Sequence, residues 1–222
     1  QEADDLGLRI AGLTEAGRIG AALSALAPVL GQRNRFALLD RIGAALTGGP
    51  IEATDAFLNR VAAGRTEGGW VVIASALRQR LSEDPVGAFS HCRAFVVSAD
   101  VWYGADIFGE RVPGPALVAD LHGHLPLLAP WRNDPNRWVR RTVGVAVHFW
   151  AKRSRGAAEL LPRARTLLAF LEPMFGEWDM TAVKGVGWGL KTMGRNYPDL
   201  MAEWLPEQVG RRHRTLMLRK AM

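Results

Sequence analysis

The chain has 222 residues, of which 48% are hydrophobic and 23% are charged, so it can bury a core, and no apolar run approaches the roughly 18–20 residues that span a bilayer. Its single cysteine, Cys92, excludes an internal disulfide framework and a cysteine-based zinc site and fits a reducing compartment. The net charge is +6, but residues 1–110 carry −3 and residues 111–222 carry +9, which makes nucleic acid a plausible partner of the second half.

Apolar residues recur at three- and four-residue spacing along most of the first half, which is the pattern of amphipathic helices. The pattern covers residues 8–30, 36–46, 53–62 and 70–81. Gly48-Gly49-Pro50 and the polar residues 64–69 interrupt it. No segment alternates apolar and polar residues with an enrichment in β-branched side chains. The sequence therefore predicts an all-α fold.

Prolines mark the starts of several further helices, because a proline at the first helical position loses no hydrogen bond. In two cases an aspartate precedes the proline and can cap the helix with its side chain. The expected starts are Asp84-Pro85, Pro113 and Pro115 before a helix over residues 116–128, Asp134-Pro135, and Pro198. The two Asp-Pro pairs lie 50 residues apart, close to the roughly 40–47 residue period of helix-pair repeats.

This periodicity favours a helical-repeat solenoid, and an irregular helical bundle with the same caps is the alternative. The breaks at residues 47–51, 64–69 and 110–115 are short, so we expect a single domain over residues 1–222. In a solenoid each repeat presents one helix to a concave face. We therefore expect a curved α-solenoid whose concave face gathers the basic residues of the second half.

Three segments between residues 101 and 191 contain aromatic residues together with acidic or basic ones. In the first, Trp102 and Asp106 are four positions apart, so on a helix they share one face at a distance of about 6 Å. The second, residues 133–141, resembles a capped helix start, and helix N-termini attract phosphate through their N–H donors and their dipole. Its arginines are Arg137, Arg140 and Arg141.

The third segment, residues 183–191, surrounds Trp188 with glycines. A glycine in a helix interior costs about 0.8–1 kcal/mol relative to alanine, so several of them need a compensating contact. Either a neighbouring helix packs unusually close, or a bulky partner approaches the backbone around Trp188. The glycines of this predicted helix are Gly185, Gly187, Gly189 and Gly194. No strand precedes them, so they do not form a dinucleotide fingerprint and no nucleotide cofactor is expected.

Taken singly, each of these residues is more typical of a helical core or of a solvated surface, but their order along the chain is more specific. The motifs are Trp-x-x-x-Asp at 102–106, Asn-x-Trp-x-x-Arg at 136–141 and Lys-x-x-Gly-Trp-x-Leu-Lys at 184–191. In this order they resemble the AlkD-like DNA alkylation repair family, whose members are HEAT-like-repeat DNA glycosylases. The resemblance is best over residues 69–205 and weak over the first 60.

The resemblance implies a role for each matching residue. Asp106 is similar to the family's catalytic carboxylate, and Arg141 is similar to an arginine that contacts the DNA backbone. Trp102 and Trp188 are similar to two aromatic residues that contact the lesion. Tyr103 after Trp102 and the glycines around Trp188 depart from the family's pattern, which bears on substrate preference more than on activity.

Base excision chemistry is compatible with these residues. Breaking an N-glycosidic bond builds oxocarbenium-like charge on the sugar, which the carboxylate of Asp106 can stabilise while it orients water. Purines alkylated at N3 or N7 are cationic, and each tryptophan face attracts a cation by roughly 0.5–2 kcal/mol. An alkylated base is already a good leaving group, so one carboxylate suffices without a general acid or a metal.

The sequence therefore predicts a DNA glycosylase that excises 3-methyladenine- or 7-methylguanine-type bases from duplex DNA in base excision repair. We expect a monomer that uses no cofactor and no metal. The alternatives are a catalytically silent HEAT-like DNA-binding module and a helical-repeat scaffold for proteins. Further DNA contacts are expected from Arg137, Arg140, Lys184, Lys191, Arg211, Arg212 and Arg214.

Other polar clusters are weaker candidates. His122 and His124 lack a third metal ligand at a fitting spacing, so surface positions are expected for them. Cys92 follows His91 without an orienting third group and is interpreted as a small buried hydrophobe. Residues 1–5 are acidic, whereas a signal peptide begins with basic residues. We therefore expect a location in the bacterial cytoplasm or nucleoid.

Overall fold

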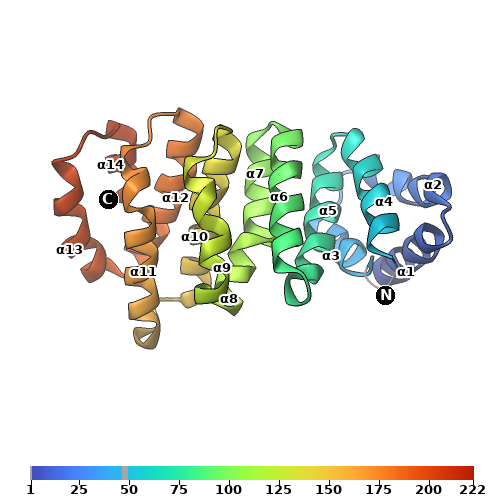
Figure 1. The fold of residues 1–222 in the computed structure, drawn as a ribbon, viewed down its shortest axis with the longest axis horizontal. Helices are drawn as coiled ribbons and strands as arrows, with labels where there is room; N and C mark the ends of the chain where they lie inside the picture. The colour runs from blue at the N-terminus through green and yellow to red at the C-terminus, as the bar shows by residue number, and fades with distance from the viewer. Residues whose placement is uncertain (1, 47–49) are drawn as a thin grey trace. The chain divides into compact units, whose positions relative to one another are not determined.

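The computed structural model describes residues 2–46 and 50–222, and every regular element in these two ranges is a helix (Figure 1). The all-α prediction is confirmed. Gly48 and Gly49 of the expected chain break lie outside the described residues. The chain divides into two compact units, Gln1–Ala99 and Asp100–Met222, and the single domain over residues 1–222 stays a prediction.

The first unit consists of six α-helices and a short 3₁₀ helix within its described residues. They are α1 (Glu2–Glu15), α2 (Ile19–Leu30), α3 (Phe36–Ala44), α4 (Ile51–Ala63), α5 (Glu67–Gln79), the 3₁₀ helix Arg80–Ser82 and α6 (Pro85–Ala99). The centre of the unit is α5, whose residues 69–77 are all buried, and α5 packs against α3. The predicted cap of α6 is confirmed, since Asp84 Oδ1 accepts a hydrogen bond from Gly87 N at 2.8 Å.

The helical pattern over residues 8–30 is divided between two helices. Gly17 has a φ of +70°, in the left-handed region, and it separates α1 from α2. A glycine adopts this conformation without steric cost, so the chain can reverse there even though the apolar spacing continues on both sides.

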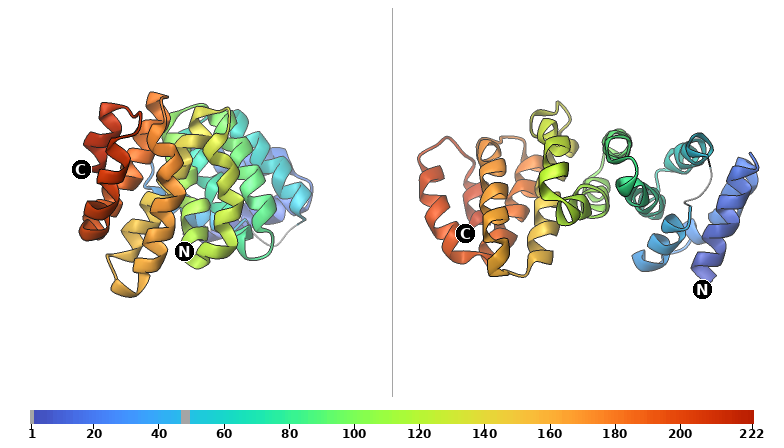
Figure 2. Two further views of the ribbon diagram at one scale, coloured as in Figure 1. Left: turned by 60° about the vertical axis from the view of Figure 1, so that its left-hand side comes forward. Right: turned by 60° about the horizontal axis from the view of Figure 1, so that its bottom comes forward.

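The second unit is a row of helices connected by shorter ones (Figures 1 and 2). Its α-helices are α7 (Trp102–Arg111), α8 (Pro113–Ala119), α9 (Leu121–Leu128), α10 (Arg137–Ser154), α11 (Leu161–Leu171), α12 (Met180–Asn196), α13 (Pro198–Val209) and α14 (Thr215–Ala221). The 3₁₀ helices are Ala129–Asn133, Ala158–Leu160 and Glu172–Gly176. α10 packs against α7 on one side and α12 on the other, and α12 packs against α14. This order, with connecting helices between successive members of the row, is the helical-repeat arrangement that the sequence predicted.

Two expected helix starts in this unit are wrong in detail. The helix after Asp134-Pro135 begins at Arg137, because Asn136 is its N-cap and accepts hydrogen bonds from Trp138 N and Val139 N. The Asp134 side chain instead accepts from Asn136 N at 2.8 Å.

The predicted helix over residues 116–128 is two helices, because the chain is extended at Asp120, which caps α9. Pro113 and Pro115 lie inside the first turn of α8, and Pro198 opens α13 as expected.

Glycines allow α10 and α12 to pack unusually close. A Cβ on Gly144 would overlap the backbone of Gly185, and a Cβ on Gly189 would lie 2.7 Å from the carbonyl oxygen of Gly144. Gly187 faces α14, where a Cβ would lie 2.7 Å from the Lys220 side chain. Close packing of neighbouring helices is therefore the reason for the glycines around Trp188. Gly194 has ordinary space around it.

Candidate functional site

A buried ion pair joins α7 to α10. Arg141 donates from Nε to Asp106 Oδ1 at 2.7 Å and from Nη2 to Asp106 Oδ2 at 2.8 Å, which is the bidentate geometry of the strongest charge-assisted hydrogen bonds. Arg141 Nη1 also donates to the carbonyl oxygen of Thr181 on α12 at 3.3 Å. The side chains of Asp106 and Arg141 are only 17% and 10% exposed. The carboxylate is therefore held in one orientation by Arg141 of α10, and Arg141 is itself held by a contact with α12.

Trp102 opens α7 and is 57% exposed, which is unusual for so large an apolar side chain. It packs edge-on against Tyr103, with ring centroids 5.6 Å apart. Because Asp106 lies four residues later on the same helix, the indole and the carboxylate project from one helix face. The exposed indole and the fixed carboxylate therefore belong to the same helix and lie one turn apart.

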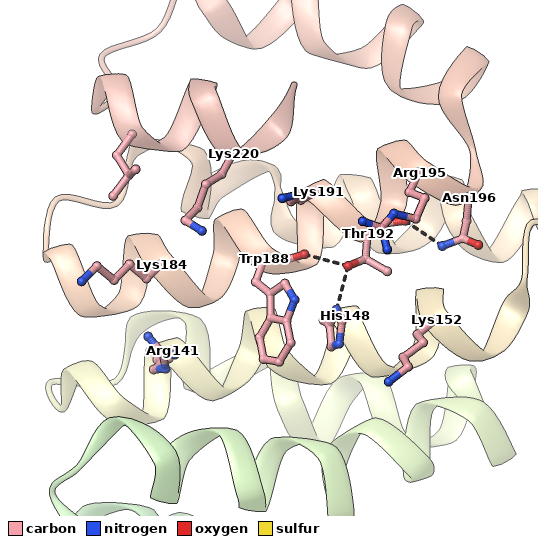
Figure 3. Close-up of a pocket in the computed structure, with 11 residues that line it drawn as sticks. Arg141, His148, Lys152, Lys184, Trp188, Lys191, Thr192, Arg195, Asn196 and Lys220 are labelled. Carbon is pink, nitrogen blue, oxygen red and sulfur yellow. Dashed lines mark hydrogen bonds between the residues drawn. The ribbon is translucent and has the colours of Figure 1, made fainter.

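Trp188 lies on α12 and stacks on His148 of α10 (Figure 3). The two ring centroids are 3.8 Å apart, and the ring planes differ by 23°. His148 Nδ1 lies 2.7 Å from the hydroxyl of Thr192, and this hydroxyl donates to the carbonyl oxygen of Trp188 at 3.0 Å. The indole is therefore fixed against α10 by its stacking partner, with Thr192 holding that partner in place.

A groove of about 670 Å³ opens around this stack, and its lining is strongly basic (Figure 3). It is lined by Arg141, His148, Lys152, Lys184, Trp188, Lys191, Thr192, Arg195, Asn196, Leu216 and Lys220. The chain has only four lysines, and all four of them line this groove. A groove with so many cations and an indole ring is suited to a polyanion that carries flat groups.

Burial lowers the proton affinity of the histidine in this groove, and two nearby cations add to the effect. Burial, together with the nearby charges of Lys152 and Arg195, lowers the pKa of His148 to about 4. His148 Nε2 lies 3.9 Å from Oε1 of Glu110, one turn beyond Asp106 on α7. Burial raises the pKa of Glu110, and the charge of Asp106 adds to this effect. At neutral pH the imidazole is therefore uncharged, and its contact with Glu110 is not an ion pair.

The other predicted DNA-binding residues fall into three groups. Lys184 and Lys191 are exposed and line the groove. Arg140 is largely engaged in the fold, since it donates to Glu177 Oε2 at 2.7 Å and to the carbonyl oxygen of Asp134 at 2.7 Å. A guanidinium with these partners holds the start of α10 in place.

The remaining predicted arginines have partners at the surface of the second unit. The guanidinium of Arg137 lies 5.1 Å from the ring centroid of Trp138. Arg212 and Arg214 lie 4.6 and 4.8 Å from the ring centroid of Trp178, which is 48% exposed. Arg211 donates to Glu172 Oε1 at 2.5 Å. These contacts leave several N–H groups of each guanidinium for other acceptors.

Sequence reasoning missed His148, Lys152, Arg195 and Lys220 as residues of the groove. A signal for two of them was present in the helical spacing. His148 follows Arg141 by seven residues, and Arg195 follows Lys191 by four, so each pair shares a helix face. Lys220 could not be found in this way, because it reaches the groove from α14.

The weaker candidates lie apart from this groove. His124 Nδ1 lies 2.9 Å from the carbonyl oxygen of Ala116 and 2.8 Å from that of Asp120, so the ring is engaged with the backbone. Within residues 2–46 and 50–222, no three His, Cys, Asp or Glu side chains are grouped so that they could hold a metal ion.

Cys92 is buried, as expected, and burial raises the pKa of its thiol well above its usual range. No helix among the described residues is long and apolar enough to cross a bilayer.

The fold and the groove together define a helical-repeat protein with a cationic, partly aromatic groove. Comparison with protein families identifies residues 62–222 as a match to the DNA alkylation repair enzyme family. The chain belongs to this family, and it has a role in the repair of alkylated DNA. The match includes the whole second unit and part of the first. No curated protein and no solved structure matches the chain.

Proposed function

We propose that the protein is a DNA glycosylase that hydrolyses the N-glycosidic bond of positively charged alkylated purines in duplex DNA. The substrates are bases of the 3-methyladenine or 7-methylguanine type. The observation that carries the proposal is Asp106, a carboxylate held by Arg141 on the same helix face as the exposed Trp102. The proposal places the protein at the first step of base excision repair.

Asp106 acts on the sugar of the damaged nucleotide. As the bond between C1′ and the base nitrogen breaks, its electron pair leaves with the base, and positive charge develops on C1′ and the ring oxygen. Each oxygen of Asp106 accepts one hydrogen bond from Arg141, and each still has a lone pair to face this charge. Water then adds to C1′ and gives its proton to the carboxylate, which returns the proton to solvent.

The tryptophans act on the base. A purine alkylated at N3 or N7 carries a positive charge before excision and leaves as a neutral molecule, so its departure needs no protonation by a general acid. The electron-rich faces of Trp102 and Trp188 favour this cation over an undamaged base. Selectivity for the lesion therefore comes from attraction to its charge.

The basic groove contacts the DNA backbone. Lys184 and Lys191, expected from the sequence, contribute to it together with the lysines of α10 and α14. Arg141 is primarily the partner of Asp106, and its contacts with Asp106 and Thr181 leave fewer of its N–H groups to donate to a phosphate. The protein acts on double-stranded DNA as a monomer, without metal or cofactor.

A base-release assay tests this proposal. The protein is incubated with a duplex that contains 7-methylguanine at one position, and the free base is measured by chromatography, with the same duplex containing guanine as the control. We expect release of 7-methylguanine at a rate well above spontaneous depurination and no release of guanine. Tight binding of the damaged duplex with no release would instead identify a catalytically silent DNA-binding module.

A further inference from the structure

His148 has no part in the chemistry described so far, yet it is the residue on which Trp188 rests. Its ring is almost parallel to the indole at a centroid distance of 3.8 Å, and its side chain is only 9% exposed. The stack covers one face of the indole. A flat ligand in the groove can therefore use only the other face.

The hydrogen bonds around the imidazole fix which nitrogen carries its proton. The hydroxyl of Thr192 has one proton, which it donates to the carbonyl oxygen of Trp188. The same oxygen can then only accept from His148, so the ring proton is on Nδ1. Because the pKa of His148 is lowered to about 4, Nε2 carries no proton at neutral pH. This arrangement describes a neutral imidazole in a single tautomer.

Charged side chains from four helices line the groove with His148 or contact its ring. They include Lys152 on α10 itself, Lys191 and Arg195 on α12, Lys220 on α14 and Glu110 on α7. Burial, together with the charges of Lys152 and Arg195, disfavours a further positive charge, which is why the pKa of His148 falls to about 4. Burial and these two charges therefore keep the imidazole uncharged throughout the physiological pH range.

The charge of the ring beneath the indole affects what can stack above it. A base on the open face of Trp188 would lie about 7 Å from the imidazole, or two stacking distances. With an effective dielectric constant of about 20, two positive charges at this separation weaken binding by about tenfold to fiftyfold. A neutral base would be affected far less. An uncharged ring directly beneath the indole therefore adds no repulsion to that of the cations that already line the groove.

We propose that His148 is a specificity-determining positioning residue, whose neutral imidazole holds Trp188 in place and keeps the indole's open face attractive to a cationic base. This inference rests on the proposed function, because it concerns the selectivity of that site. It assigns Lys152 a second role beyond binding phosphate, since its charge adds to the effect of burial in keeping His148 neutral. It also explains why an ionisable residue occupies a position where phenylalanine would stack equally well: the Nδ1 proton ties the ring to Thr192.

The test compares His148→Phe, which keeps a neutral ring, with His148→Arg, which places a permanent positive charge beneath Trp188. Both carry Asp106→Asn so that the lesion stays intact, and the reference is Asp106→Asn alone. For each protein, fluorescence anisotropy gives the ratio of affinities for a duplex containing 7-methylguanine and the same duplex containing guanine. We expect His148→Phe to keep this ratio within about twofold and His148→Arg to reduce it by about tenfold or more. An unchanged ratio in His148→Arg would contradict the inference.

A second measurement needs no substitution and no DNA. The ring protons of His148 in the free wild-type protein, assigned by their loss in His148→Phe, are followed by NMR from pH 7.5 to pH 4. We expect no titration above pH 5, whereas a midpoint above pH 6 would overturn the inference. Neither measurement depends on base release. A wild-type protein that releases no base would count against the glycosylase proposal, while the affinity ratio and the titration decide the role of His148.

Discussion

Asp106 is the residue on which the proposed reaction depends, and the ion pair with Arg141 makes its role separable from DNA binding. We predict that Asp106→Asn binds damaged duplex within about twofold of wild type, because the side-chain shape is kept. Single-turnover excision should fall by about a hundredfold to a thousandfold, since the charge that stabilises the oxocarbenium ion is lost.

Asp199→Asn is the matched control for this prediction, since Asp199 is exposed in the first turn of α13 and does not line the groove. It should leave the excision rate unchanged. Near wild-type single-turnover rates in Asp106→Asn would show that the catalytic carboxylate is another residue. A loss of affinity equal to the loss of rate would show that Asp106 serves the fold through Arg141.

The depressed pKa of His148 predicts how stability depends on pH. As the pH falls below about 6.5, the unfolded chain binds a proton at this residue, but the folded protein does not until the pH approaches 4. The free energy of unfolding should therefore decrease across this window, by about 2 kcal/mol from His148. Glu110 acts in the opposite direction, because its raised pKa lets the folded state bind a proton first.

Comparing wild type with His148→Phe isolates the histidine contribution, since Glu110 is present in both. Urea unfolding at pH 7, 6, 5 and 4.5 gives the free energy of each protein. We expect the wild-type curve to fall more steeply below pH 6.5 than the variant curve. Parallel curves would mean that His148 is protonated equally in the folded and unfolded states.

The candidate site could be predicted from the sequence only in part. Trp102, Asp106 and Trp188 stand in motifs that resemble a family, so the motifs alone are enough to select them. The pairing of Asp106 with Arg141 could not be predicted, because 35 residues separate them and a helical pattern carries no information on which helices meet. His148 was missed because a histidine among apolar helix residues is more often a core residue than part of a site.

At the scale of the helices, the close contact of α10 and α12 determines where Trp188 and His148 lie. We predict that Gly144→Ala lowers the free energy of unfolding by about 3 kcal/mol, because the added methyl group meets the rigid backbone of Gly185. A forced separation of the helices would also weaken the stack of Trp188 on His148. Thermal melts and tryptophan fluorescence measure the two effects.

Gly194→Ala provides the control on the same helix. The nearest heavy atom to its added Cβ would be 3.5 Å away, which is ordinary contact, so alanine should stabilise α12 by about 0.5–1 kcal/mol. Equal destabilisation by both substitutions would mean that loss of glycine flexibility, and not helix packing, explains the effect of Gly144→Ala.

The helix boundaries show what local sequence patterns determine and what they leave open. The apolar spacing correctly predicted that every described segment of regular structure is helical. It could not select between Asp134 and Asn136 as the cap of α10, because both side chains can accept backbone N–H groups and they lie two residues apart. Asp120 divides a predicted helix for the same reason, since a capping residue inside an apolar run can start a new helix.

For the molecule as a whole, the distribution of charge is the property that determines binding to DNA. The second half carries a net charge of +9, and much of its arginine charge is already paired or stacked, as in Arg140 with Glu177. The lysines differ, because all of them line the groove. The net charge of the chain is therefore a poor guide to the number of phosphates bound, and the lysines are a better one.

The lysines should account for most of the salt dependence of binding. Each lysine that neutralises a phosphate contributes about 0.9 to the slope of log K against log salt concentration. We predict that Lys184→Gln and Lys191→Gln each lower this slope by about 0.9, and that replacing Lys152, Lys184, Lys191 and Lys220 together lowers it by up to about 3.6. Fluorescence anisotropy with undamaged duplex between about 50 and 200 mM salt measures the slope.

Arg163→Gln is the control, because Arg163 is an exposed residue of α11 that does not line the groove, and this substitution should leave the slope unchanged. If the variant that lacks all four lysines has the wild-type slope, the DNA backbone lies outside the groove. If Arg163→Gln and Lys184→Gln lower the slope equally, only the net charge of the protein determines the salt dependence.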